Sequence, residues 1–157
     1  HPVVRAMPNT PLTVGAGMSA YACGRYADEC ASGVTELLLG AAGRTVRVHE
    51  RDLDAVTGLS GSGPAYAFLM IEALIEGGVA AGLKRETASL LAAQTILGAA
   101  QMALASKHSP ADLRAAVTSP AGTTAAGLRA LERAGVRSAL IEAVLAAAER
   151  SKELGRA

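Results

Sequence analysis

Two neighbouring segments that are long, apolar and almost free of charge constrain the fold of this chain more than any other feature. The first is predicted as a helix over about Pro64–Ala81, and its only charged residues are Glu72 and Glu76. The second is predicted as a helix over Arg85–Ser106, and it carries no charged side chain from Thr87 onward. A helix that is apolar on all sides is buried in a protein core or an interface, or it spans a membrane.

Composition favours burial within protein over a membrane span. The second segment contains Gln94 and Gln101, and its apolar residues are mostly alanine. Half of the 157 residues are hydrophobic, yet aromatic residues make up only 3%, with no Trp and one Phe. Small aliphatic side chains bury little area each, so we expect many closely packed helices, a large subunit interface and no membrane span.

Charge, cysteine and histidine usage argue against several classes of function. The formal net charge is +1 and no cluster of basic residues occurs, so we expect no nucleic-acid partner. Cys23 and Cys30 form no CxxC motif and the three histidines are far apart, so we expect neither a disulfide framework nor a metal site. The chain opens without the pattern of a signal peptide, and we expect a cytoplasmic protein.

Residues 1–50 have a different pattern from the rest of the chain. Short apolar runs at Val3–Met7 and Met18–Cys23, with alternation over Thr45–His49, predict three strands. Helical spacing over Asp28–Leu39 predicts one helix between the last two strands. This set is too small for a complete doubly wound domain, so we expect an α/β remnant, the end of a larger sheet domain.

No strand pattern occurs from Asp52 onward. A short helix is expected over Asp52–Thr57, followed by a glycine-rich break over Leu59–Pro64 and by the two long apolar helices. Further helices are expected at three places: from about Ser109, from Ser119 and over Arg137–Leu154. The chain is therefore expected to be mainly α, with the α/β remnant over residues 1–50 and an all-helical domain over residues 51–157.

The segment around residue 120 is the strongest candidate for a binding site. Ser119 is predicted as the N-cap of a helix and Pro120 as its first residue. The following N–H groups, on Gly122, Thr123 and Thr124, then have no intrahelical acceptor. Free N–H groups at the positive end of a helix bind carboxylates or phosphates. The alternative is an ordinary capped helix without a ligand.

Three other motifs leave a structural and a functional interpretation open. Val14–Ala20 matches GxGxxA, but a strand is expected after it rather than before it, so a turn is favoured over a dinucleotide site. Gly61–Pro64 is a flexible helix start that either closes over a ligand or permits close packing of two helices. Glu50 ends a predicted strand, where a carboxylate either serves a site or is a solvated loop acid.

Three blocks of sequence follow one another at a specific spacing: Met7–Pro11 (MPNTP), Asp54–Tyr66 (DAVTGLSGSGPAY) and Thr118–Thr124 (TSPAGTT). Taken together, they resemble pyrroline-5-carboxylate reductase, and the resemblance covers essentially the whole chain. It implies that the chain is the end of an N-terminal Rossmann domain followed by an all-helical dimerisation domain. The glycine fingerprint of that family is absent from this sequence, so the chain is expected to be incomplete and inactive by itself.

The activity that the resemblance implies is hydride transfer from NADPH or NADH to 1-pyrroline-5-carboxylate. The product is L-proline, and the reaction is the last step of proline biosynthesis. The resemblance also implies a homo-oligomer, either an intertwined dimer or a decamer of such dimers.

The resemblance places the substrate at the loop that begins with Ser119 and near Glu50. It implies that Thr124 is the catalytic residue and hydrogen-bonds the ring nitrogen. The backbone N–H groups of Thr123 and Thr124, with Gly122 beside them, are implied to hold the substrate carboxylate. Glu50 matches a family acid near the substrate.

The cofactor side is implied to include Met7, Pro8 and Asn9, near the nicotinamide. Two positions depart from the family pattern. Ala116 stands where some relatives carry a polar residue near the cofactor, and Ala121 replaces a glycine that is common in the loop. A small residue at position 121 is expected to be tolerated unless the backbone there needs a positive φ.

Two alternatives stand beside a reductase of this family. The first is a non-catalytic helical dimerisation module descended from such a reductase, which differs from the enzyme by a true absence of the upstream fingerprint. The second is a related NADP-dependent reductase of another imine or of a keto acid, which a panel of substrates separates from the first.

Overall fold

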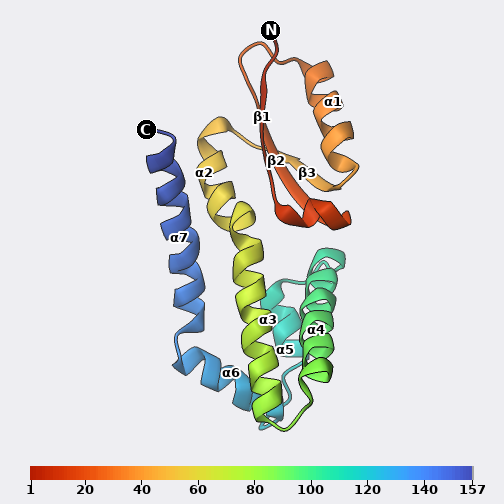
Figure 1. The fold of residues 1–157 in the computed structure, drawn as a ribbon, viewed down its shortest axis with the longest axis vertical. Helices are drawn as coiled ribbons and strands as arrows, with labels where there is room; N and C mark the ends of the chain where they lie inside the picture. Colours follow the sequence, from red (N-terminus) through yellow and green to blue (C-terminus); the bar gives the residue numbers. More distant parts are fainter. Residues whose placement is uncertain (157) are drawn as a thin grey trace. The chain divides into compact units, whose positions relative to one another are not determined.

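The computed structural model describes residues 1–156, which form a three-stranded sheet and a set of helices (Figure 1). It divides into two compact units, residues 1–66 with 140–156 and residues 67–139. The expected fold class is confirmed, because a small sheet is followed along the chain by helices. The boundary after residue 50 stays a prediction, since the two units follow contacts in space rather than chain order.

The sheet has the strand order β1-β2-β3, with β1 at Val4–Pro8, β2 at Gly17–Cys23 and β3 at Gly43–Arg47. Strand β2 is antiparallel to β1 and parallel to β3. The parallel pair is joined by helix α1 (Glu29–Gly40), which contacts all three strands and is capped by the Asp28 carboxylate. The predicted succession of strand, strand, helix and strand is confirmed.

The core of this unit lies between β2 and the elements that pack on it. Ala20, Tyr21 and Ala22 of β2 are buried, as is Leu53 of the short helix α2 (Leu53–Val56). Alternate residues of a strand point to opposite faces. Burial of three consecutive residues therefore means that both faces of β2 are covered.

Tyr21 connects the sheet to α1. Its hydroxyl donates to a carboxylate oxygen of Glu36 (2.5 Å) and lies 2.8 Å from the hydroxyl oxygen of Ser32. The hydrogen bond to Glu36 raises the pKa of Tyr21 above its ordinary value, because ionisation would remove the donor. A fully buried hydroxyl is thus satisfied by two partners on one helix.

The expected glycine-rich break over Leu59–Pro64 is wrong, because this part of the chain remains helical. Helix α2 continues into a π turn at Thr57–Gly61, and helix α3 (Gly63–Ala80) follows. The N–H of Ser62 donates to the carbonyl of Thr57 (2.8 Å), which widens the helix by one residue. Glycine here serves close packing rather than chain reversal.

Gly58 shows what that packing requires. A Cβ atom at position 58 would lie 2.5 Å from the carbonyl oxygen of Val144 and 2.9 Å from the amide nitrogen of Ala148. Both belong to helix α7 (Val136–Leu154). The hydroxyl of Tyr66 also reaches this contact, donating at 3.2 Å to the carbonyl of Ala143. Gly58 lies before Gly61–Pro64, and for those residues the choice between closure over a ligand and close packing of two helices stays open.

The second long apolar helix is α4 (Arg85–Ala105), followed by α5 (Pro110–Ala116), in agreement with the sequence. Ser109 caps α5, since its hydroxyl oxygen accepts from the N–H of Asp112 (3.2 Å) while the Asp112 carboxylate accepts from the N–H of Ser109 (3.0 Å). A further hydrogen bond from the Ser109 hydroxyl lowers the pKa of Asp112. The last helices are α6 (Thr123–Arg133) and α7.

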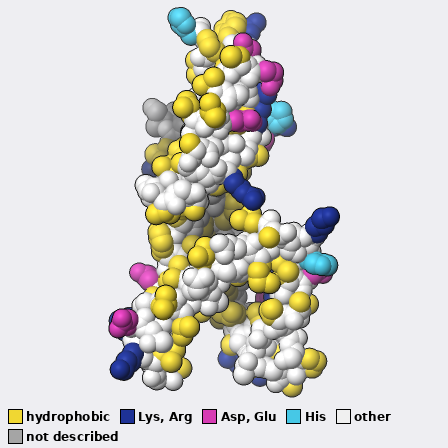
Figure 2. Space-filling view, turned by 90° about the vertical axis from the view of Figure 1, so that its right-hand side faces the viewer, with side chains coloured by type: hydrophobic (Ala, Val, Ile, Leu, Met, Phe, Trp, Pro, Cys, Tyr) yellow, Lys and Arg dark blue, Asp and Glu magenta, His cyan; other side chains and the backbone are white. Residues whose placement is uncertain are grey.

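Most large apolar side chains of the helices are exposed in the single chain. Within residues 67–139, all of which the structure describes, the buried hydrophobic side chains are Ala88 and Ala92 of α4. Figure 2 shows hydrophobic side chains at many places on the face in view. Those more than half exposed include Phe68, Leu69, Leu90, Met102 and Leu104.

Two helical stretches, Glu50–Ala80 and Arg85–Ala105, are long and apolar enough to cross a membrane by length and composition. The core helix of a soluble protein meets the same criteria, so this observation does not separate lipid from protein as the cover of these helices.

Candidate functional site

The segment from Ser119 to Gly122 forms a turn and not the start of a helix. The N–H of Gly122 donates to the carbonyl oxygen of Ser119 (3.0 Å), and Ala121 has a φ of 56°. Proline at the second position and a positive φ at the third are features of a type II turn. The N-cap of α6 is therefore Gly122, and the expectation that Ser119 caps the helix and Pro120 opens it is wrong.

This start of α6 gives Thr123 and Thr124 the N–H groups of its first turn. Neither N–H has an acceptor among the described residues, and both side chains are exposed. The N–H of Gly122 is not free, because it closes the turn. Two of the three expected donors are thus available to a ligand.

A cavity of about 440 Å³ adjoins this turn. Its lining comprises Ala121, Gly122, Ala125, Ala126 and Arg129. Ala125 and Ala126 follow Gly122 by three and four residues, and Arg129 follows it by seven, so these positions share one face of the helix. Within residues 1–156 the Arg129 guanidinium forms no ion pair, and it brings an uncompensated positive charge to the cavity that the turn borders.

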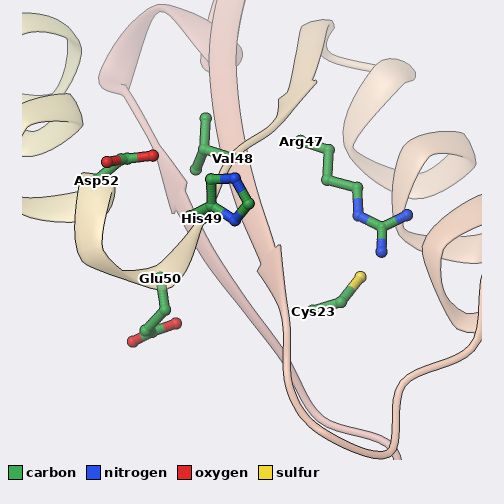
Figure 3. A pocket seen from close by; sticks show the side chains of 6 residues that line it. All are labelled: Cys23, Arg47, Val48, His49, Glu50 and Asp52. Atoms are coloured by element: carbon green, nitrogen blue, oxygen red, sulfur yellow. The ribbon is translucent and has the colours of Figure 1, made fainter.

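Glu50 belongs to the other unit and lines a cavity of about 590 Å³ (Figure 3). This cavity lies at the carboxyl ends of the parallel strands β2 and β3, a common position for ligands in α/β sheets. Its lining residues are Cys23, Arg47, Val48, His49, Glu50 and Asp52. Strand β3 ends at Arg47, so Glu50 does not end a strand as expected, but begins the 3-10 turn Glu50–Asp52.

The charged groups of this cavity already have partners. A carboxylate oxygen of Glu50 lies 2.6 Å from a guanidinium nitrogen of Arg5, on β1. Arg47 donates to Glu29 of α1 at 2.9 Å, and this hydrogen bond raises the pKa of Arg47. The second carboxylate oxygen of Glu50 makes no hydrogen bond within the described part of the chain.

The three residues expected near the cofactor lie at the end of β1, but they differ in how they are used. Met7 and Pro8 are the last residues of the strand. Asn9 follows, and its side-chain amide is engaged on both sides. Its Oδ1 accepts from the N–H of Met18 (2.9 Å), and its Nδ2 donates to the carbonyl of Ser60 (3.2 Å).

Three residues of these sites were not singled out from the sequence. Arg129 could have been found, because helical spacing places it on the face of Gly122. Ser60 could also have been found, because the residue four positions later is Pro64. Proline has no N–H, so the Ser60 carbonyl needs another donor. Arg5 had none, because only the pairing of β1 with β2 brings it near Glu50.

The GxGxxA motif is a turn, as favoured from the sequence. Gly15, with a φ of 72°, ends the 3-10 turn Thr10–Val14, and β2 follows at once. No dinucleotide-binding strand–turn–helix unit is formed there. Among residues 1–156, no group of three or more His, Cys, Asp or Glu side chains could hold a metal ion.

Sequence comparison relates the chain to one family. The profile described as pyrroline-5-carboxylate reductase dimerisation matches residues 50–154. Pyrroline-5-carboxylate reductase of a Synechocystis strain is 53% identical over 156 residues, which is 99% of this chain and 58% of the relative. The Arabidopsis thaliana enzyme is 52% identical over 153 residues, 98% of this chain and 55% of the relative. The chain thus spans little more than half the length of these relatives.

Solved structures give the same result. Plasmodium falciparum pyrroline carboxylate reductase, with NADP bound, superposes with a TM-score of 0.93 at 37% identity, covering 99% of this chain and 62% of that one. A pyrroline-5-carboxylate reductase from Coxiella burnetii also has a TM-score of 0.93, at 44% identity, covering 98% of this chain and 57% of that one.

Proposed function

The chain belongs to the pyrroline-5-carboxylate reductase dimerisation family, and on that premise we propose that the protein reduces 1-pyrroline-5-carboxylate to L-proline with NADPH or NADH. This is the last step of proline biosynthesis. The relatives at about half sequence identity are named for this reaction, which supports the proposal.

The structural observation that carries the proposal is the start of α6. The N–H groups of Thr123 and Thr124 are free of acceptors within the described residues, and the positive end of the helix dipole lies at the same place. The guanidinium of Arg129 adds a full charge to the adjoining cavity. A carboxylate is the group that such donors bind, and the substrate carries one.

Orientation supplies much of the catalysis in this proposal. With the carboxylate on the N–H groups, the ring of the substrate is fixed relative to α6, and a fixed approach of the reacting atoms is worth several powers of ten in rate. The hydroxyl of Thr124, exposed beside its own N–H, orients the ring nitrogen and relays a proton from water. Glu50 stabilises the positive charge of the protonated imine through the carboxylate oxygen that Arg5 leaves free.

The nicotinamide, when bound, supplies the hydride. The residues present fit only the nicotinamide end of a dinucleotide. Within residues 1–156, no strand leads through a glycine-rich turn into a helix, which is the unit that binds the phosphates. Met7 and Pro8 at the end of β1 would hold the nicotinamide, and Asn9 acts next to them. The choice between NADPH and NADH depends on residues near the adenosine, outside this set.

The exposed apolar side chains support a homo-oligomer as the functional form. Leu90 and Leu104 of α4 are 71% and 63% exposed in the single chain, and large apolar patches of this kind mark subunit interfaces. We expect a second copy of the chain to cover them, in an intertwined dimer or a decamer of dimers, and not a lipid bilayer or a nucleic acid. Both cysteines are free thiols, which supports a cytoplasmic location.

The test is steady-state kinetics on the full product of the gene, with 1-pyrroline-5-carboxylate and either cofactor. Thr124→Ala is expected to lower kcat by about tenfold or more, because it removes the hydroxyl that orients the nitrogen. Thr124→Ser keeps a hydroxyl and is expected to keep most of the activity. A wild-type product that forms the oligomer but reduces neither this imine nor a panel of other imines and keto acids would establish the dimerisation module instead.

A further inference from the structure

Pro64 removes a hydrogen-bond donor from the helical stretch that links α2 to α3. In an α-helix, the carbonyl of each residue accepts from the N–H four residues later. For Ser60 that residue is Pro64, which has no N–H. In a π turn the donor would be one residue later, but the N–H of Ala65 donates to the carbonyl of Ser62 (3.0 Å) instead. The carbonyl of Ser60, a half-buried residue, is therefore without its helical partner.

Asn9 supplies the missing donor. Its Nδ2 lies 3.2 Å from the Ser60 carbonyl oxygen, and 3.5 Å from the hydroxyl oxygen of the same residue. The other side of the same amide, Oδ1, accepts from the N–H of Met18 (2.9 Å). One side chain thus connects the end of β1, the start of β2 and the π turn.

A second contact joins the same segments. A Cβ atom at Gly61 would lie 2.5 Å from the terminal methyl carbon of Met7, so the Met7 side chain occupies the space beside this glycine. Met7 is also packed against the core formed by Ala20, Ala22 and Leu53. The position of Met7 therefore depends on where the π turn lies relative to β1.

We propose that Asn9 is a positioning residue of the reductase, which holds Met7 and Pro8 in place by donating to the carbonyl that Pro64 leaves unpaired. This inference rests on the proposed function, in which Met7 and Pro8 hold the nicotinamide. Asn9 does not itself need to touch the cofactor, because both groups of its amide are used within the chain. Its role requires an amide, since a carboxylate of the same shape has no donor for the Ser60 carbonyl.

The first experiment compares Asn9→Asp with the wild type in the full gene product. The substitution keeps an acceptor for the N–H of Met18 and places a negative charge against the Ser60 carbonyl. We expect the KM for NADPH or NADH to rise about tenfold, the effect of one lost hydrogen bond to a half-buried group. The KM for the imine is expected to stay within about twofold, because its carboxylate binds at α6. A merely structural role would lower the active fraction and leave both KM values unchanged.

The second experiment tests the dependence on Pro64. Pro64→Ala returns an N–H to the position four residues after Ser60, so the carbonyl no longer needs Asn9. In the double variant Asn9→Asp/Pro64→Ala, we expect the KM for the cofactor to return to within about threefold of Pro64→Ala alone. The inference would be overturned if the two substitutions changed the cofactor KM additively, because sites that do not interact have additive effects.

The same four proteins are compared by urea unfolding, which needs no activity. A non-additive stability change establishes the contact between Asn9 and Ser60 even if the gene product proves to be no reductase. An active enzyme in which Asn9→Asp leaves the cofactor KM unchanged overturns the positioning role and leaves the proposed function intact. A folded but inactive wild type refutes both the proposed function and the positioning role.

Discussion

The guanidinium of Arg5 lies 2.6 Å from a carboxylate oxygen of Glu50, so an ion pair joins the first strand to the turn that follows the third. The Arg5 and Glu50 side chains are 60% and 59% exposed. Exposed ion pairs contribute at most about 1 kcal/mol to stability, because water screens them and ordering two long side chains costs entropy. We therefore expect Glu50 to contribute more to the proposed reaction than to the stability of the fold.

The variants Glu50→Gln and Arg5→Gln separate these two roles. Each is expected to change the free energy of unfolding by less than about 1 kcal/mol. Only Glu50→Gln is expected to lower kcat/KM for the imine, by about tenfold, because only it removes the negative charge that in the proposed function stabilises the protonated nitrogen. Urea unfolding and steady-state kinetics give the two quantities. Equal kinetic losses in both variants would mean that the ion pair, and not the carboxylate, matters.

Ala121→Gly is expected to stabilise the chain by about 0.5–1 kcal/mol. A left-handed backbone costs an alanine roughly 1–2 kcal/mol, and glycine returns most of this despite its greater freedom in the unfolded state. Ala130→Gly in the interior of α6 is the matched control, and it is expected to destabilise by about 0.5–1 kcal/mol. The measurement is chemical denaturation of all three proteins. A destabilised Ala121→Gly would show that the backbone at position 121 is not strained.

Arg129→Gln is expected to raise the KM for the imine several-fold, with little change in kcat. The side chain lines the cavity beside the turn, and its charge favours binding of an anion in both the ground state and the transition state. Arg133→Gln, one helical turn further on, removes the same charge and serves as the control. Raising the salt concentration should reduce the difference between wild type and Arg129→Gln, whereas it should leave Arg133→Gln and wild type alike.

Tyr21→Phe is expected to destabilise the first unit by about 1–3 kcal/mol at neutral pH, because it leaves the buried Ser32 hydroxyl without its partner. The folded pKa of Tyr21 is raised, so its contribution is complete below the unfolded pKa of about 10 and is lost as pH rises through the folded pKa. The difference between wild type and variant should therefore shrink above about pH 10. Tyr26→Phe is the control, since Tyr26 is 71% exposed, and unfolding as a function of pH measures both.

The sequence was informative where local chemistry decides the structure. The cap at Ser109 and the short strands of the first fifty residues depend on neighbours in the chain, and they were placed to within a few residues. The resemblance supplied the family, because three spaced motifs carry more information than any single one. The roles of Thr124, Glu50 and the other site residues stay predictions.

What the sequence did not predict has two physical causes: competition between two local signals, and contacts between segments that are distant in the chain. Ser119 and Pro120 fit a helix start as well as a turn. The structure has the turn, which is closed by a hydrogen bond from the N–H of Gly122 to the carbonyl of Ser119. The glycines after Leu59 predict a break, but the chain there stays helical. The nearby Gly58 allows the approach of α7, which no local pattern reveals. The pairing of Arg5 with Glu50 depends in the same way on tertiary structure.

The two buried alanines of residues 67–139, Ala88 and Ala92, have a thermodynamic consequence. Burying a methyl side chain contributes less than about 1 kcal/mol, so these two side chains offset only a small part of the entropy of ordering the helices. In the proposed homo-oligomer, further stabilisation comes from surface that becomes buried when copies of the chain meet, and mass action then links folding to protein concentration. Dilution should lower the melting temperature of this protein, and the helices should unfold as the copies separate.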